Sequence, residues 1–112
     1  MYRIGGNTPA MFERATTTKN SIGEDVQTWE PVGSLTGWLD LQTGGVGYTA
    51  YNAPIVEASH VFLADYNATI AAASAETCRA VIGGKRYDVL LIDDPMGLHE
   101  QLEVYLKYTG GK

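Results

Sequence analysis

The chain has 112 residues and a formal net charge of −5, because 13 Asp and Glu residues outnumber 8 Lys and Arg residues. This length predicts one domain with one modest core. The acidic balance disfavours non-specific binding to DNA or to anionic membranes, since both attract Lys and Arg. The single cysteine, Cys78, excludes an internal disulfide, and the chain has too few Cys and His residues for common structural zinc sites.

No apolar run approaches the roughly 20 residues that cross a bilayer, and none near the N-terminus has the length of a signal peptide. We therefore expect a cytoplasmic protein. The 13 glycines separate short apolar or alternating runs, which favours several short strands over long helices. Pro31 cannot donate a hydrogen bond to a ladder, so its strand either ends there or lies at a sheet edge. In chain order, the first half predicts a strand over 11–18, a turn over 19–25, a strand over 26–32, a turn at Gly33-Ser34 and a strand over 37–42.

The second half continues this pattern. Alternation is clearest over 55–66, which predicts a strand, whereas 67–77 is rich in alanine and fits either a short helix or a loop. A hairpin is predicted from 78–82 and 86–92, joined by the three-residue connection Gly83-Gly84-Lys85, and a turn follows over 93–97. Residues 98–108 alternate with period two, which favours a strand, although a helical spacing competes, and 109–112 form a frayed tail.

These elements predict a mainly β domain over 1–112, an antiparallel barrel or sandwich of about six strands with one short helix at most. The residues from Thr43 to Pro54 differ from the rest, because no charge occurs between Thr43 and Val56. Glycine-rich backbone is costly to order, so we expect a long mobile loop, which in a small domain is more often functional than connective. Its candidate functional residues are Gly44, Gly45, Val46, Gly47, Tyr48, Thr49 and Tyr51.

No catalytic constellation emerges from the sequence. The Gly83-Gly84-Lys85 run is no phosphate-binding loop, because Arg79 stands where that loop needs glycine and Arg86 where it needs Ser or Thr. A metal site at Asp93, Asp94, His99 and Glu100 is a weaker interpretation than a solvated turn.

Four further residues have ordinary structural interpretations. We interpret His60 as a core or interface histidine and Cys78 as a small buried apolar residue. Trp29 and Trp38 fit core or sheet-face positions. We therefore predict a structural or interaction protein that is no enzyme and uses no metal or cofactor.

Several segments together carry a resemblance to a known family. They are Glu24–Trp29, Gly37–Leu41, Glu57–Leu63, the hairpin from Arg79 through Gly84 to Pro95, and His99–Leu106. In order and spacing, this set resembles the phage head–tail joining family, the small head-completion or stopper proteins between portal and tail. The resemblance covers most of the chain, from about Glu24 to Tyr108.

The resemblance implies a small β-barrel that assembles as a ring, expected to be a dodecamer. The implied partners are a portal or adaptor ring protein, a tail-completion protein and further copies of the chain. Packaged DNA would pass through the channel without specific binding, and no membrane is involved. The implied location is the head–tail junction of the virion, and the host cytoplasm during assembly. The loop over 43–54 would lie in the channel and form a gate.

Two alternatives stay open. One is a tail-completion or tail-terminator ring protein of similar size. The other is a small bacterial β-barrel binding module with Tyr48 and Tyr51 on a specificity loop. We expect the isolated chain to be a monomer or a weak oligomer, because copies of net charge −5 repel one another.

Overall fold

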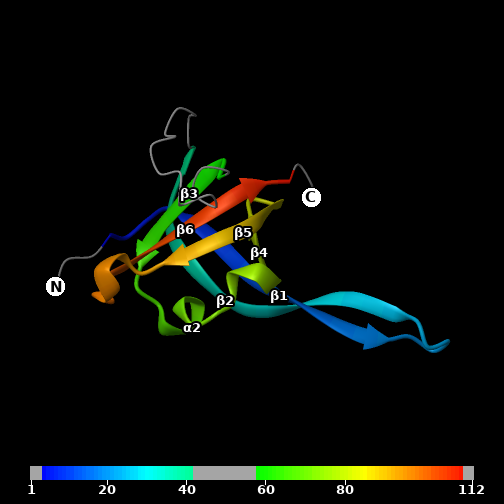
Figure 1. The fold of residues 1–112 in the computed structure, drawn as a ribbon. Coiled ribbons are helices and arrows are strands. Elements are labelled where there is room, and N and C mark those ends of the chain that lie inside the picture. The colour runs from blue at the N-terminus through cyan, green and yellow to red at the C-terminus, as the bar shows by residue number, and fades with distance from the viewer. Residues whose placement is uncertain (1–3, 42–57, 110–112) are drawn as a thin grey trace.

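The computed structural model describes residues 4–41 and 58–109 and shows six antiparallel strands that close into a barrel (Figure 1). The strands are β1 (Thr8–Lys19), β2 (Asp25–Leu41), β3 (His60–Asp65), β4 (Cys78–Ile82), β5 (Lys85–Asp93) and β6 (Gln101–Tyr108). Around the barrel they follow the order β1-β2-β3-β6-β5-β4. The helical pieces are α2 (Ala68–Ala71), η1 (Ala75–Thr77) and η2 (Pro95–Gly97). The predicted mainly β barrel is confirmed.

The barrel interior is filled by alternate residues of its strands. Along β6, Leu102, Val104 and Leu106 are completely buried, while the residues between them are only partly covered. This period of two confirms the predicted strand over its helical competitor. The strand starts at Gln101 and not at Leu98, because the bend after η2 continues to Glu100. The largest fully buried side chains are Phe12, Phe62, Ile70, Leu102, Leu106 and Val104.

The predicted turn at Gly33-Ser34 is wrong, because 26–32 and 37–42 belong largely to one continuous strand, β2. A bulge replaces the turn: Phe12 pairs with Gly33 and Glu13 with Pro31, which leaves Val32 as the extra residue. Around Pro31, β2 pairs with β1 and with no other described strand, so Pro31 lies at a sheet edge. Of the two predicted alternatives, the edge position is confirmed and the strand end is not.

The two glycines of β2 serve close packing. A Cβ at Gly33 would lie 3.3 Å from Cδ1 of Ile70 in α2. A Cβ at Gly37 would lie 2.0 Å from the Leu63 carbonyl oxygen of β3. Both glycines therefore allow a neighbouring element to approach the strand closely, whereas the sequence alone predicted a turn at Gly33.

The hairpin between β4 and β5 has a shorter connection than predicted. Lys85 already pairs with Ile82, so the loop consists of Gly83 and Gly84 alone. Both have positive φ, 60° and 79°, as a two-residue turn that matches strand twist requires. The segment 67–77 contains two of the three helical pieces, α2 and η1. Asn67 caps the start of α2, because its side chain accepts a hydrogen bond from the Ile70 amide at 3.1 Å.

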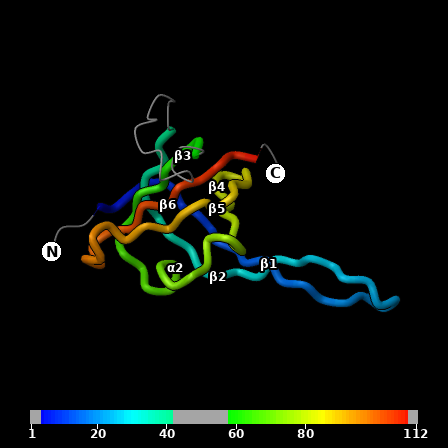
Figure 2. Tube along the Cα trace, viewed as in Figure 1, coloured from blue at the N-terminus to red at the C-terminus, as the bar shows by residue number. Residues whose placement is uncertain are grey.

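The β1–β2 hairpin extends well beyond the barrel (Figure 2). Pairing of β1 with β4 ends at Arg14, so residues 15–29 form a free two-stranded ribbon, which we call the arm. The arm explains the elongated dimensions of 50 × 32 × 26 Å. At its tip, the Asn20 side chain accepts hydrogen bonds from the Ile22 and Glu24 amides, which confirms the predicted turn.

Candidate functional site

The residues predicted from the sequence to line the channel lie outside the described part of the chain. These are Gly44, Gly45, Val46, Gly47, Tyr48, Thr49 and Tyr51. The described residues that flank the segment are Leu41 and Ala58, and Leu41 pairs with His60 across β2 and β3. The segment is thus joined to the end of the barrel where β6 finishes.

That end of the barrel carries basic and aromatic side chains, and we call it the basic end. It consists of Lys85, Arg86, Lys107, His60, Tyr87 and Tyr108. The His60 ring meets Tyr87 edge-on at 5.2 Å between centroids, and Tyr108 lies 5.4 Å from Tyr87. The Lys85 ammonium lies 5.8 Å from the Tyr108 ring centroid. The three rings pack together at this mouth of the barrel with Lys85 beside them, while Arg86 and Lys107 lie on the outer face of β5 and β6.

His60 is a packed histidine, as predicted. Its Nδ1 lies 2.9 Å from the Ser59 hydroxyl oxygen, and this hydroxyl donates to the Leu106 carbonyl at 3.4 Å. Burial, and then the nearby Lys85 charge, lower the pKa of His60, so the neutral ring is favoured. Burial, and then Tyr108, raise the pKa of Tyr87. These shifts follow from packing at the mouth and identify no proton acceptor for a reaction.

The opposite end of the barrel is acidic. The acidic end consists of Asp65, Asp93, Asp94, Glu100 and Glu103, with His99 among them. Asp93 and Glu103 are directly paired across β5 and β6, so like charges face each other. Burial, then Glu103 and Asp94, raise the pKa of Asp93. Asp65 accepts hydrogen bonds from the Ile4 and Gly5 amides at 2.7 and 3.2 Å, which ties the N-terminal segment to this end.

A short loop projects from the acidic end at η2. Met96 and His99 both have positive φ, 57° and 58°, which is uncommon for residues with a side chain. Asp94 holds the loop, because its carboxylate accepts from the His99 amide at 3.0 Å and pairs with the His99 ring. That ring stacks on Tyr66 at 4.6 Å. As a result Met96 is 90% exposed and Leu98 is 58% exposed.

The sequence alone did not indicate this loop as a functional candidate. Met96 was predicted to lie in a turn, and a metal site at His99 and Asp94 was the weaker interpretation. In the structure these two polar groups brace a loop that displays apolar side chains. The sequence feature that could have indicated the loop is Met96, a large apolar residue between Pro95 and Gly97 in a predicted turn.

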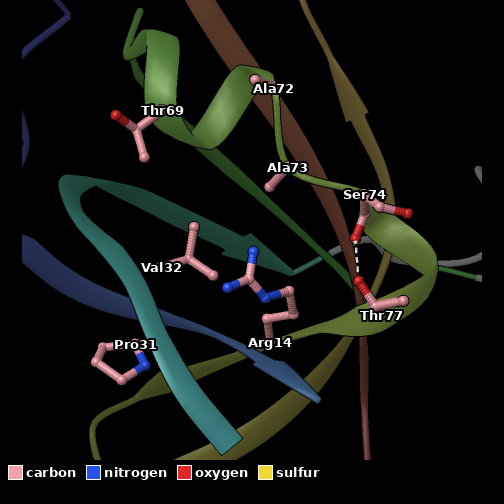
Figure 3. A pocket seen from close by; sticks show the side chains of 8 residues that line it. All are labelled: Arg14, Pro31, Val32, Thr69, Ala72, Ala73, Ser74 and Thr77. Atoms are coloured by element: carbon pink, nitrogen blue, oxygen red, sulfur yellow. Dashed lines mark hydrogen bonds between the residues drawn. The ribbon is translucent and has the colours of Figure 1, made fainter. Parts of the chain in front are cut away.

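A shallow groove lies where the arm leaves the barrel (Figure 3). It encloses about 530 Å³ and is lined by Arg14, Pro31, Val32, Thr69, Ala72, Ala73, Ser74 and Thr77. Its charged lining group, Arg14, pairs with Glu30 at 3.0 Å. The Thr77 hydroxyl donates to the Ser74 carbonyl at 3.2 Å. The groove therefore offers small side chains and engaged polar groups, with no set of side chains arranged for catalysis.

The remaining sequence candidates have structural positions. Cys78 is buried, as predicted, and burial raises the pKa of its thiol. Trp29 lies on one face of the arm with the Arg79 guanidinium 4.0 Å from its ring centroid. Trp38 is 42% exposed and donates to the Ile4 carbonyl at 3.0 Å. Both tryptophans are sheet-face residues, one of the two positions predicted.

Neither a metal-binding cluster nor a membrane-spanning helix occurs among the described residues. Over 4–41 and 58–109, no group of three or more His, Cys, Asp or Glu side chains is placed to hold a metal ion. No helix in this part of the chain is long and apolar enough to cross a membrane.

The fold defines a small β-barrel protein with a basic, aromatic end and an acidic end. Comparison with known proteins specifies the class further. The model of the phage head completion protein family matches residues 5–107, nearly the whole chain. The chain belongs to the phage head completion protein family.

Solved structures show the same fold. The solution structure of protein SF1141 from Shigella flexneri 2a has a TM-score of 0.70 with 14% identity, and the match covers 100% of both chains. A chain of the virion of a native gene transfer agent particle has a TM-score of 0.52 with 16% identity over 89% of this chain and 91% of that one. No curated protein matches this chain in sequence. Membership of the family supports a structural head-completion role in a virion, and the two solved structures support the fold.

Proposed function

We propose that the chain forms a ring below the portal or adaptor, closes the DNA channel there and provides the surface to which the tail attaches. The observation that carries this proposal is the match of the head completion family over residues 5–107. The barrel fits it, because large apolar side chains such as Met96 and Leu98 are exposed, as is common where proteins contact one another. The role is structural and non-enzymatic.

The charge of the chain fits this role. Packaged DNA must slide past the connector, and proteins bind DNA mainly by neutralising its phosphates with Lys and Arg. A subunit of net charge −5 repels phosphate on average. The proposed partners are the portal or adaptor ring, a tail-completion protein and further copies of the chain. The proposed location is the head–tail junction, reached from the host cytoplasm during assembly.

The channel role of 43–54 stays a prediction from the family resemblance. Its test is a deletion of Gly44 to Tyr51 in the phage or prophage that encodes the chain. We expect heads that carry the shortened protein to lose their DNA. Heads that incorporate the shortened protein and still retain DNA would show that this segment is no gate.

The experiment for the whole proposal is removal of the gene followed by complementation. We expect particles without the protein to package DNA and then release it, measured as DNA that becomes sensitive to nuclease. Free tails should accumulate beside these heads. Complementation with the wild-type chain should restore both DNA retention and tail attachment. Heads that keep their DNA and join tails without the protein would contradict the proposed function.

A further inference from the structure

The two ends of the barrel are complementary in charge and in apolar surface. The acidic end carries five carboxylates, Asp65, Asp93, Asp94, Glu100 and Glu103, and its described residues include no Lys or Arg. The basic end carries Lys85, Arg86 and Lys107, together with two carboxylates: Asp88, which faces Lys107 across the strands, and Asp40, which precedes Leu41 in β2. β6 spans from one end to the other, and its eight residues separate the ends by about 24 Å.

The acidic end projects a prearranged apolar knob. Met96 and Leu98 are exposed on a loop whose backbone is held by the Asp94 hydrogen bonds. The Gly97 amide donates to the Asp94 carbonyl at 2.9 Å and fixes the loop further. Strained backbone and exposed large apolar side chains both cost free energy in a free subunit, and they occur together at contact sites. The loop needs little ordering when it binds.

The basic end offers an aromatic surface of the kind that such a knob fits. Tyr108 is 41% exposed and lies over the buried Tyr87. The exposed Lys85 lies beside it, with its ammonium 5.8 Å from the Tyr108 ring centroid, while Lys107 lies on the outer face of β6 opposite Asp88. Tyrosine is favoured at protein interfaces, because it combines a rigid apolar ring with a polar group.

We propose that the acidic end of one copy docks on the basic end of the next copy. In this contact Met96 and Leu98 pack against the Tyr108 surface, while the surrounding carboxylates approach Lys85. The two surfaces differ, so the contact is heterologous, and repeated copies form a ring where the rotation between neighbours closes. This inference rests on the proposed function. The opposite charges of the two ends favour another copy of the chain as the binding partner of each end.

The contact is weak in a free pair. The exposed charges are screened by salt, and the copies repel one another through their net charge. We therefore expect association only at millimolar concentration in solution, and efficient ring formation where a neighbouring ring holds the copies together. Low salt should strengthen this association, because local attraction between the ends is electrostatic.

The first test reverses one charge at each end. Glu100→Lys and Lys85→Glu both alter exposed side chains, and neither side chain forms an ion pair with another described residue. Sedimentation at millimolar concentration and low salt should show that either variant alone associates at least about tenfold more weakly than wild type. The chain with both substitutions should regain association, because the reversed charges face each other again. An absence of wild-type association, or of any recovery in the double variant, would overturn the proposal.

The second test removes the knob without harming the fold. Met96→Gly suits the positive φ at this position, so the variant should keep or slightly raise its melting temperature while association weakens. Ile22→Ser at the arm tip is the matched control, because Ile22 is also a large apolar residue and is 75% exposed. The control should associate like wild type. A loss of association in the control with none in Met96→Gly would place the contact on the arm.

Incorporation into particles separates this inference from the proposed function. If the charge-reversed variants associate normally in solution but fail to enter particles, the ends bind a different virion protein and self-docking is wrong. If wild-type copies associate end to end but the chain is absent from purified particles, the proposed function fails while the contact stands.

Discussion

The arm and one part of the barrel share the two long strands β1 and β2, but the two regions are held together differently. In the barrel, Phe12 of β1 is 1% exposed and lies among completely buried side chains. In the arm no residue is buried. The arm instead relies on cross-strand side-chain pairs, such as Thr16 with Thr28 at 2.7 Å and Lys19 with Asp25 at 2.6 Å. Each such pair contributes under about 1 kcal/mol. We therefore expect the buried side chains of the barrel to provide most of the free energy of folding, and the exposed side chains of the arm to contribute little to it.

The largest expected effect is in the barrel interior. Phe62→Ala should lower the free energy of unfolding by about 3 to 5 kcal/mol, because a fully buried aromatic ring leaves a cavity. Chemical denaturation measures this loss. Trp38→Ala is the control from the outer face of β2, where the ring is 42% exposed, and should cost much less. Equal losses in the two variants would mean that the barrel interior does not dominate stability.

The next effect is at the close contact of β2 with β3. Gly37→Ala should cost at least about 3 kcal/mol, since its Cβ would lie 2.0 Å from a backbone oxygen that cannot move aside. The matched control is Gly33→Ala, whose Cβ would meet the flexible end of Ile70 at 3.3 Å. Thermal unfolding of both variants measures the difference. A larger loss for Gly33→Ala would contradict the close packing of these strands.

A smaller effect is expected when the arm is shortened. Replacement of residues 17–27 by Asn-Gly would connect Thr16 to Thr28, which already pair, through a two-residue turn. We expect the free energy of unfolding to change by no more than about 1 kcal/mol, because the removed residues are exposed. Circular dichroism during thermal unfolding measures this. A chain that no longer folds would show that the arm is part of the folding unit.

The smallest effect concerns pH at the acidic end. The pKa of Asp93 is raised in the folded chain by burial and by Glu103 and Asp94, so the folded state binds a proton at higher pH than the unfolded state does. Ionised Asp93 therefore destabilises the fold, and lowering the pH through the folded pKa relieves this penalty.

Asp93→Asn should thus be more stable than wild type at neutral pH, by less than about 1 kcal/mol. The gain should disappear in acid, where Asp93 is protonated in both states. Urea denaturation of both proteins across this pH range measures it. An equal difference at all pH values would contradict the carboxylate cluster as its cause.

Much of the barrel was predictable because strand alternation is a local signal. The run Leu102, Val104, Leu106 has the same period in the sequence as in the barrel interior. The continuity of β2 was not predictable, because Gly33 and Gly37 are shaped by Ile70 and Leu63, which are distant in sequence. A glycine that permits close approach and a glycine that makes a turn have the same local signature.

The candidate surfaces were less predictable than the fold. Strand pairing brings Lys85 beside Tyr108 and Asp93 beside Glu103. The two residues of each pair lie on different strands, so the sequence around either residue does not reveal the contact. Exposure of Met96 depends on a positive φ held by Asp94, which composition does not reveal. The family resemblance pointed to the general role, which the family match confirms. The nominated residues Gly44 to Tyr51 lie outside the described chain, so their role stays a prediction.

The most direct measurement of the central claim is a cryo-electron microscopy reconstruction of the head–tail junction of the particles whose genome encodes this chain. We predict a ring of these barrels between the portal or adaptor and the tail, with the channel passing through the ring. Barrel density at another position, or purified particles from which mass spectrometry shows the chain to be absent, would contradict the assignment of this protein to the head–tail connector.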